Sequence, residues 1–438
     1  MLRACGHIIG PMLASFAGMT ETRGSRGTCW TAGLALLAIL GAMPAKAAEP
    51  IKIGLSMSLT GGLGGGGKSA LLGMQIWEQD VNAAGGLLGR PVQLVYYDDQ
   101  SSSANVPGIY TKLLDVDKVD LVISAYATNQ IAPAMPIVMQ KNMVFMALFG
   151  TGVNDKFHYD KYFQILPNGK ETRFGPSLGY LETAMTMDPK PKTIALAGAD
   201  AEYAQTVLAG AREKVRALGL KIVYDRSYPP NTVDFQGIVR SIQAAAPDIV
   251  YIASYPPDTV GLVRAAHEAG LKTKMFGGGM IGLAFAPIKQ QLGPLLNGIV
   301  SYDVYVPEPT MKFPGVEAFL KRYQEKAPAA GVDPLGYYLP PFAYAELQIL
   351  GEAIGKVGSL DQTKIAAYIH QTRFHTIVGD VKFAENGEWE KSRILFVQYQ
   401  GVTGNDIDQF RRPGKQVILY PPALKSGEFR YPYSEAQN

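Results

Sequence analysis

Apolar and polar positions follow two alternating periods along this chain, which predicts strands and helices in turn. Short apolar runs rich in valine, isoleucine and tyrosine predict strands over residues 51–57, 92–98, 119–124, 143–147, 193–198, 221–225, 248–253, 274–278 and 298–304. Segments with helical spacing fill most of the gaps, over residues 68–83, 105–115, 131–141, 171–186, 202–217, 235–245, 257–269 and 285–292. This alternation indicates an α/β fold whose parallel sheets are covered by helices on both faces.

Nine strands would make an unusually large single sheet, so we expect two doubly wound lobes. The turn-forming cluster Leu166-Pro167-Asn168-Gly169 predicts the first break between them. After about Val304 the pattern changes, and we expect two further helices over 314–326 and 339–357. A hairpin over 378–399, with Asn386-Gly387 as its turn, should follow. The tail after Asn405 is rich in proline and tyrosine, and we expect it to wrap the surface with few contacts.

The first 47 residues read as an export signal. Arg23 and Arg26 provide a positive start, Thr31 to Met43 an apolar run, and Ala45-Lys46-Ala47 a small-residue cleavage site. The apolar run is shorter than the ~20 residues that a membrane-spanning helix needs. We therefore expect cleavage near Ala47 and an extracytoplasmic chain.

Export changes the interpretation of charge and cysteine content. Both cysteines, Cys5 and Cys29, fall in the predicted signal, so the exported part has no disulfide. The signal also carries all of the excess of 41 basic over 38 acidic residues, because it holds Arg3, Arg23, Arg26 and Lys46 against Glu21. The remainder is close to neutral, which gives no electrostatic footprint for nucleic acid or anionic lipid.

A glycine-rich turn follows the first predicted strand and allows two interpretations. Gly62, Gly67, Lys68 and Ser69 satisfy the pattern G-x-x-x-x-G-K-[ST] of a nucleotide phosphate loop. In such a loop Lys68 would reach the terminal phosphates and Ser69 would hold magnesium. An exported protein meets little nucleotide, so we favour the second interpretation, in which Lys68 is a solvated residue of a first helical turn.

The sequence gives little support to hydrolytic or metal chemistry. Asp98-Asp99 ends a predicted strand, and we favour hydrogen bonds to turn amides over an acid–base pair. There is no G-x-S-x-G elbow. None of the histidines after residue 47 has a metal-ligand spacing: His158, His267, His370 and His375. We predict no enzymatic activity, cofactor or metal.

A binding cleft accounts for more of the sequence. Ligands of doubly wound sheets sit beyond the carboxyl ends of the strands. Thr128 and Thr151, with the amides of Gly150 and Gly152, follow two such strands and are neutral donors suited to a carboxylate. Aromatic residues at the same ends predict flat walls with polar tips: Tyr126, Phe149, Tyr203 and Tyr255.

Four segments carry a family resemblance: IKIGLSMSLTGG, NAAGGLLGRPVQLVYYDDQSS, SAYATNQIAPAMP and LVRAAHEAGLKTKMFGGG. They resemble the periplasmic leucine/isoleucine/valine-binding proteins, the type I solute-binding components of ABC importers for hydrophobic amino acids. The resemblance runs from about Ala48 to Tyr399. It implies a type I periplasmic binding protein fold, with two α/β lobes joined by a hinge of three crossings and the ligand between them.

The resemblance also implies boundaries and partners. Lobe one would comprise 48–167 plus 304–376, and lobe two 168–303 plus 377–438 with the C-terminal tail. The protein would be a periplasmic monomer that captures a small solute by hinge closure and delivers it to an inner-membrane ABC permease.

Several ligand-binding positions of the family keep suitable residues here. Thr128 matches the position whose hydroxyl and amide hold the ligand carboxylate, and Tyr203 matches the tyrosine on the second-lobe loop. The remaining matches are Gly150, Thr151, Gly152, Ser254 and Tyr255.

Two positions depart from the family pattern. The acidic residue that pairs with the ammonium of an amino acid falls at Gly279, and the aromatic wall of the side-chain pocket falls at Gly66. The family's disulfide positions match Ser101 and Ala127. An ammonium buried without a carboxylate is strongly disfavoured, and loss of the aromatic wall would enlarge the pocket.

We therefore hypothesise a ligand that has a carboxylate but needs no ammonium, such as an aromatic or aliphatic acid. If Asp200 or Glu202 reached the ammonium instead, a hydrophobic amino acid would still bind. Two hypotheses from different functional classes stay open beside it: a ligand-sensing module for a membrane receptor, and the phosphate-loop enzyme.

Overall fold

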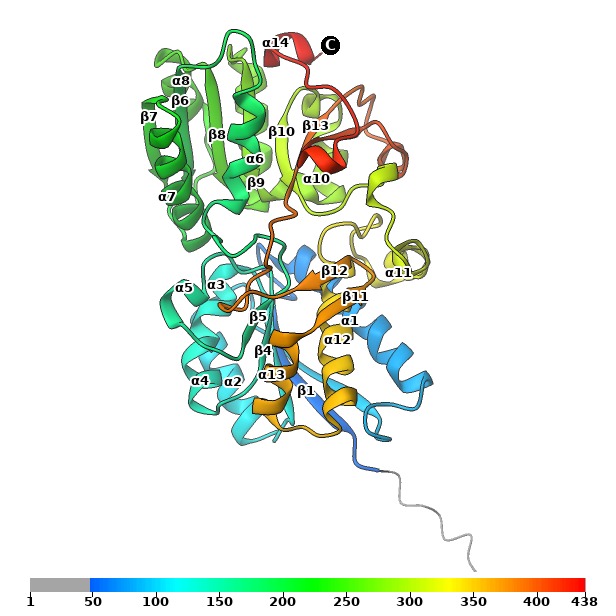
Figure 1. Ribbon diagram of the computed structural model, residues 1–438. Coiled ribbons are helices and arrows are strands. Elements are labelled where there is room, and N and C mark those ends of the chain that lie inside the picture. The colour runs from blue at the N-terminus through cyan, green and yellow to red at the C-terminus, as the bar shows by residue number, and fades with distance from the viewer. Residues whose placement is uncertain (1–47, 438) are drawn as a thin grey trace, which may run out of the picture. The chain divides into compact units, whose positions relative to one another are not determined.

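The computed structural model describes residues 48–437. The predicted export signal and its cleavage site near Ala47 lie outside the described residues. Two β-sheets organise the described part of the chain, and helices flank the strands of each (Figure 1). Within residues 48–437, no helix combines the length and the apolar character that crossing a membrane requires.

The first sheet has five parallel strands in the order β2-β1-β3-β4-β5. Its strands are β1 (Ile51–Met57), β2 (Val92–Asp98), β3 (Leu121–Tyr126), β4 (Phe145–Leu148) and β5 (Tyr162–Gln164). β3 and β4 are buried along their whole length, as expected for central strands of a parallel sheet covered on both faces.

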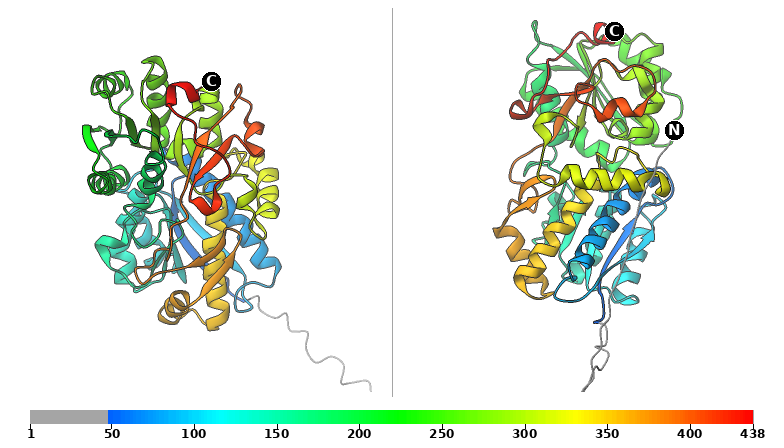
Figure 2. Two further views of the ribbon diagram at one scale, coloured as in Figure 1. Left: turned by 45° about the horizontal axis from the view of Figure 1, so that its top comes forward. Right: turned by 90° about the vertical axis from the view of Figure 1, so that its right-hand side faces the viewer.

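Helices from two distant parts of the chain cover this sheet. α1 (Gly64–Ala83) and α12 (Pro340–Val357) lie side by side (Figure 2). The other helices of the N-terminal part are α2 (Val106–Asp115), α3 (Thr128–Ile131), α4 (Met135–Gln140) and α5 (Asn154–Phe157).

The second sheet has seven strands in the order β14-β13-β10-β9-β8-β6-β7. Five are parallel: β6 (Thr193–Ala199), β7 (Lys221–Tyr228), β8 (Ile249–Ser254), β9 (Met275–Met280) and β10 (Val300–Asp303). β13 (Leu395–Tyr399) and β14 (Gln416–Tyr420) add an antiparallel edge. The helices of this part are α6 (Gly175–Ala184), α7 (Glu202–Ala217), α8 (Gln236–Ala244), α9 (Pro256–Glu268), α10 (Ala286–Leu292) and α14 (Tyr433–Ala436).

The chain passes between the two sets of elements three times: after β5, after β10 and before β13. The segment between the last two crossings contains α11 (Val316–Ala330), α12, α13 (Gln362–Gln371), β11 (Arg373–Thr376) and β12 (Gly379–Lys382). The segment after β5 and the segment before β13 are in contact: the amide of Arg393 donates to the carbonyl of Pro167 at 2.9 Å. The lobe boundaries stay a prediction, and the one after residue 376 falls in the turn between the paired strands β11 and β12.

Two expectations about the C-terminal part were wrong. The tail after Asn405 does not merely wrap the surface, because it supplies β14 and buries Tyr433. The predicted hairpin over 378–399 forms only next to its turn, because β12 pairs with β11, whereas β13 pairs with β10 and β14. The turn itself is present, with Gly387 at φ +75° and a single bridge between Phe383 and Trp389.

Candidate ligand-binding site

Residues at the carboxyl ends of β3, β4, β6, β8 and β9 converge on one small cavity. Five of the predicted site residues line it: Tyr126, Thr128, Thr151, Tyr203 and Tyr255. The rest of the lining consists of Ala127, Phe149, Leu166, Ile281, Tyr302 and Tyr338. Its volume is about 10 Å³, enough for a single water at most. We call it the central cavity.

Lobe one contributes two threonines at the carboxyl ends of β3 and β4. The Thr151 amide donates to Thr128 Oγ1 at 3.0 Å, and Asn168 Nδ2 lies 3.5 Å from Thr151 Oγ1. Ala127 has φ +84°, which directs the chain from β3 into this turn. Among the described residues, neither threonine hydroxyl has an acceptor for its own proton, so both remain available as donors.

Lobe two contributes two tyrosines at the starts of α7 and α9. The Tyr203 hydroxyl donates to the Gly279 carbonyl at 3.2 Å, and the Tyr255 hydroxyl accepts from the Tyr203 amide at 3.2 Å. Tyr255 also donates to Asn129 Oδ1 of lobe one at 3.1 Å. Tyr255 therefore links the lobes directly beside the central cavity.

A third group of tyrosines completes the lining. The Tyr302 and Tyr338 hydroxyls bond to each other, and the Phe149 ring packs edge-on against Tyr338 at 5.0 Å. The Tyr126 hydroxyl is buried and has no hydrogen-bond partner in the described part of the chain. Burial, and then the nearby Tyr255 hydroxyl, raises the pKa of Tyr126 above its ordinary value. Tyr126 therefore stays neutral and keeps its proton for donation.

Five predicted site residues do not line the central cavity, among them Ser254, Gly150 and Gly152. The Ser254 hydroxyl is buried against Thr259 Oγ1 at 2.8 Å, because Ser254 faces the first turn of α9. The Gly150 carbonyl accepts from Gln164 Nε2 at 2.7 Å. Gly152 has φ +67°, and a β-carbon there would lie 3.1 Å from Thr206 of α7. The two glycines thus shape the loop after β4 and do not face the cavity.

The two glycines that depart from the family pattern lie where other side chains fill the space. A β-carbon on Gly279 would lie 2.9 Å from the Tyr251 hydroxyl and 3.0 Å from the Tyr203 hydroxyl. On Gly66 it would lie 2.9 Å from the Tyr126 ring and 3.1 Å from Phe285. Aromatic side chains from elsewhere therefore lie against both glycines, and the expected enlargement of the pocket stays a prediction.

No charged residue lines the central cavity. The two acids considered as partners for an ammonium are engaged outside it. Glu202 Oε1 lies 2.6 Å from Lys156 Nζ, and Asp200 Oδ1 accepts from Gln205 Nε2 at 3.0 Å. Neither carboxylate contributes to the lining.

The glycine-rich turn is part of a helix and not a phosphate cradle. α1 already begins at Gly64, so the Gly67 amide donates to the Leu63 carbonyl at 3.0 Å. The Ser69 hydroxyl is buried and donates to the Gly65 carbonyl at 2.8 Å, whereas Lys68 is exposed. These contacts confirm the interpretation of Lys68 as a solvated residue.

Asp98 and Asp99 hold this turn in place. Asp99 accepts from the Ser58 hydroxyl at 2.6 Å and the Ser101 amide at 2.9 Å, and Asp98 accepts from the Leu59 amide at 2.9 Å. The predicted capping role is confirmed. No group of histidine, cysteine or acidic residues suited to a metal occurs between residues 48 and 437.

A second cavity of about 220 Å³ adjoins the central one. We call it the apolar cavity. Its lining is mostly glycine and apolar: Gly62, Leu63, Gly65, Gly66, Tyr126, Pro256, Phe285, Pro287, Ile288, Gly331, Val332 and Asp333. Tyr126 alone among the described residues lines both cavities.

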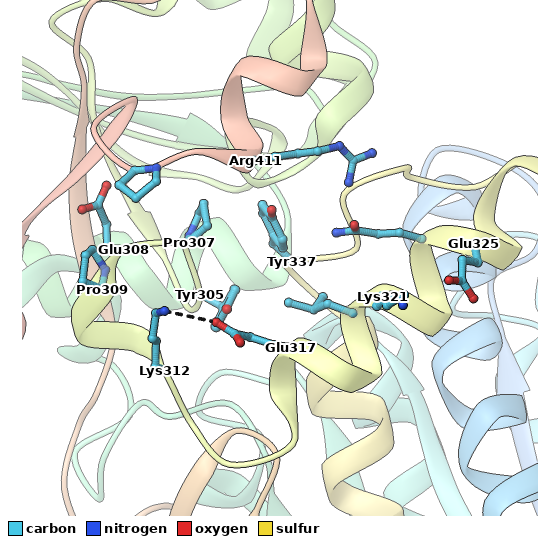
Figure 3. Close-up of a pocket in the computed structure, with 13 residues that line it drawn as sticks. Tyr305, Pro307, Glu308, Pro309, Lys312, Glu317, Lys321, Glu325, Tyr337 and Arg411 are labelled. Atoms are coloured by element: carbon cyan, nitrogen blue, oxygen red, sulfur yellow. Dashed lines mark ion pairs between the residues drawn. The ribbon is translucent and has the colours of Figure 1, made fainter.

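A more open groove of about 710 Å³ lies along α11 (Figure 3). Several of its polar groups are already engaged: Lys312 Nζ lies 3.4 Å from Glu317 Oε1, and Glu308 Oε1 accepts from the Gly414 amide at 2.7 Å. Arg411 binds Asp408 at 2.6 Å and the Pro334 carbonyl at 3.2 Å. Lys321 and Glu325 also line this groove and are exposed, so it lies open to solvent.

Asp258, in the first turn of α9, makes the stability of this region depend on pH. It is buried, and burial raises its pKa from 3.8 to about 6 despite the hydrogen bond from Tyr228. Because the folded pKa is the higher one, the folded state binds the proton more tightly, and stability falls as the pH rises from about 4 to above 6. We expect Asp258→Asn to remove up to about 3 kcal/mol of this fall.

Urea unfolding of both proteins between pH 4 and pH 8 tests this expectation. Other buried acids titrate in both proteins, so the difference between the two curves reports on Asp258. Parallel curves over the whole range would contradict the shifted pKa of Asp258.

Comparisons with known proteins assign the chain to a protein family. Residues 50–402 match a family described as periplasmic binding protein. The Leu/Ile/Val-binding protein homolog 7 of Brucella abortus (strain 2308) is 25% identical over 417 residues, which cover 90% of this chain and 98% of that protein.

Two solved structures share the fold. One is the substrate-binding protein LivJ from Streptococcus pneumoniae in complex with isoleucine, with a TM-score of 0.67 and 17% identity over 85% of this chain and 100% of that one. The other is an ABC transporter solute-binding protein from R. palustris in complex with 4-hydroxybenzoate, with a TM-score of 0.69 and 19% identity over 84% and 95%.

Proposed function

Because this chain belongs to the periplasmic binding protein family, we propose that it captures a small carboxylate-bearing solute between its lobes. The family match confirms the predicted resemblance and the type I fold. The protein is thus an extracytoplasmic solute-binding component of an ABC transporter and not an enzyme, which excludes the phosphate-loop hypothesis.

The observation that carries the ligand class is the set of unpaired donors around an uncharged cavity. Thr128, Thr151 and Tyr126 each keep a hydroxyl proton without an acceptor among residues 48–437. A carboxylate is an acceptor with two oxygens and about four lone-pair sites, so one such group satisfies several of these donors. Hydrogen bonds to an ionised acceptor are also the stronger ones.

An α-amino acid fits these residues less well. Its ammonium would enter a cavity without any carboxylate, and such a burial costs several kcal/mol. The position of the family's acid, Gly279, lies against the neutral hydroxyls of Tyr203 and Tyr251. An aromatic or aliphatic acid avoids this cost because it brings no ammonium.

Both ligand classes occur on this fold, since the S. pneumoniae protein is in complex with isoleucine and the R. palustris protein with 4-hydroxybenzoate. The fold therefore cannot decide between them, and the choice rests on the lining residues. For this chain the absence of an acid at Gly279 favours the second class.

We further propose that capture occurs by hinge closure. Contacts between the lobes surround the central cavity, including Tyr255 with Asn129 and Lys156 with Glu202. A ligand shifts the open–closed balance only through contacts that are better in the closed state. In this scheme the protein is a periplasmic monomer, and its closed form docks on an inner-membrane permease.

Calorimetry with leucine, phenylalanine, benzoate and coumarate tests the ligand class. We expect the acids to bind and the amino acids not to bind. Thr128→Val should lower the affinity for the acids by about 10- to 100-fold, the effect of losing a hydrogen bond to a charged group. Thr111→Val, at an exposed position of α2, is the matched control. Tight leucine binding without affinity for either acid would refute the proposed ligand class.

A further inference from the structure

The two cavities beside Tyr126 divide between them the features that an acid ligand needs. The central cavity has the hydroxyl donors but room for only one water, at about 10 Å³. The apolar cavity has about 220 Å³ but few donors. An apolar cavity of ~150 Å³ is sufficient for a benzene molecule. The apolar cavity therefore accommodates an aromatic ring, and the central cavity only the head group.

The one charged residue of the apolar cavity is not available to a ligand. Asp333 Oδ2 accepts from the Ala286 amide at 2.6 Å, and its Oδ1 accepts from the Leu335 amide at 2.8 Å and the Gly336 amide at 3.0 Å. With both oxygens engaged, this cavity recognises a ligand by shape and apolar contact.

Tyr126 forms the partition between the cavities. Its ring packs directly against Gly66, because a β-carbon on Gly66 would lie only 2.9 Å from the ring. Its hydroxyl is fully buried without a partner, so no hydrogen bond fixes the ring in this place. Leaving such a group unpaired is unfavourable, and a ligand carboxylate that accepted its proton would remove that cost.

We infer that Tyr126 is a specificity-determining residue whose ring moves aside, and that the ligand is an aryl acid with a short linker between ring and carboxylate. This inference rests on the proposed capture of a carboxylate. The carboxylate occupies the donor side, beside Thr128 and Thr151, and the ring occupies the apolar cavity, beside Gly66 and Phe285. The linker must span the distance that the Tyr126 ring now separates, and an aromatic ring is ~3.5–4 Å thick. About two or three bonds of ~1.5 Å each between the carboxylate carbon and the aryl ring cover that distance.

A series of acids with one head group and one ring tests the inference: benzoate, phenylacetate, 3-phenylpropionate and 4-phenylbutyrate, titrated into the purified protein by calorimetry. We expect affinity to rise along the series to 3-phenylpropionate, by about 10-fold or more over benzoate, since each methylene buried adds ~0.8 kcal/mol and the ring leaves water.

Gly66→Leu should narrow the apolar cavity and abolish that gain, so that the ratio of the affinities for 3-phenylpropionate and benzoate falls to about 1. Gly355→Leu is the matched control, because Gly355 is an exposed helical glycine whose side-chain direction is open. Ile288→Phe narrows the same cavity from a half-buried position on the other lobe and serves if Gly66→Leu does not fold.

The outcomes separate the two claims. Benzoate as the tightest of the four acids, or an equal loss for all four in both Gly66→Leu and Ile288→Phe, would overturn the inference and leave the proposed function standing. Failure of all four acids to bind would overturn the inference, and the proposed ligand class would fall with it only if leucine bound in their place.

Discussion

Replacing Gly67 by alanine is expected to destabilise the protein by about 4 kcal/mol or more, which only severe steric changes produce. A β-carbon at this position would lie 1.9 Å from the Ser58 carbonyl oxygen and 2.8 Å from its carbonyl carbon. Ser58 directly follows β1, and its buried hydroxyl donates to Asp99 at 2.6 Å. This hydrogen bond keeps the Ser58 backbone from moving away from the added β-carbon. Urea unfolding of the purified variant measures the loss.

The neighbouring positions provide the controls for this prediction. Gly65→Ala should be tolerated, because nothing lies within 4 Å of its side-chain direction. Lys68→Ala should change stability by less than about 0.5 kcal/mol, as exposed positions usually do, and should leave solute binding intact. A phosphate loop would show the reverse, with Lys68 essential for binding. A Gly67→Ala protein as stable as the wild type would contradict the steric argument.

The pattern of apolar residues located the strands of both sheets well. The predicted strands 51–57 and 92–98 coincide with β1 and β2, and the predicted helix 202–217 coincides with α7. These elements are buried on one or both faces, so their buried positions are the apolar positions of the sequence pattern. The predicted helix 131–141 is instead a broken series, α3, a 3₁₀ turn over 132–134 and α4, because Pro133 and Pro136 interrupt its hydrogen bonds.

The antiparallel edge of the second sheet was harder to predict. β14 has the apolar run QVILY, but the prolines and tyrosines around it suggested an irregular tail. β13 and the Asn386-Gly387 turn were both recognised, yet they were joined in one hairpin because sequence distance favours local pairing. The partner of β13 is β10, about a hundred residues away, and only tertiary packing specifies that choice.

The candidate site shows the same limit. The residues at strand ends were predictable, since five of the ten predicted site residues line the central cavity. Tyr302 and Tyr338 were missed as site residues, although Tyr302 lies in a predicted strand and Tyr338 just before a predicted helix. Neither belongs to a turn after a strand of the N-terminal half, so no local signal placed them beside Tyr126. Likewise, a glycine such as Gly66 does not indicate from the sequence which distant aromatic ring packs against it.

Tyr203→Ala is expected to weaken both binding and closure. Tyr203 is 5% exposed, and its ring packs edge-on against Tyr255 at 5.7 Å. Truncation removes a wall of the central cavity and the support of the Tyr255 contact to lobe one. Removing a buried interface aromatic typically costs ~2 kcal/mol or more, so we expect the affinity for 3-phenylpropionate to fall about 30-fold or more. Calorimetry measures this loss.

Closure has its own readout, because X-ray scattering follows the radius of gyration with and without 3-phenylpropionate. The wild type should become more compact on addition of the acid. The Tyr203→Ala variant should stay expanded at the same concentration, since a ligand closes the lobes only through contacts made in the closed state. Tyr224→Ala, on the edge strand β7 of the same lobe, should behave like the wild type. A Tyr203→Ala variant that keeps both its affinity and its compaction would show that lobe two does not take part in capture.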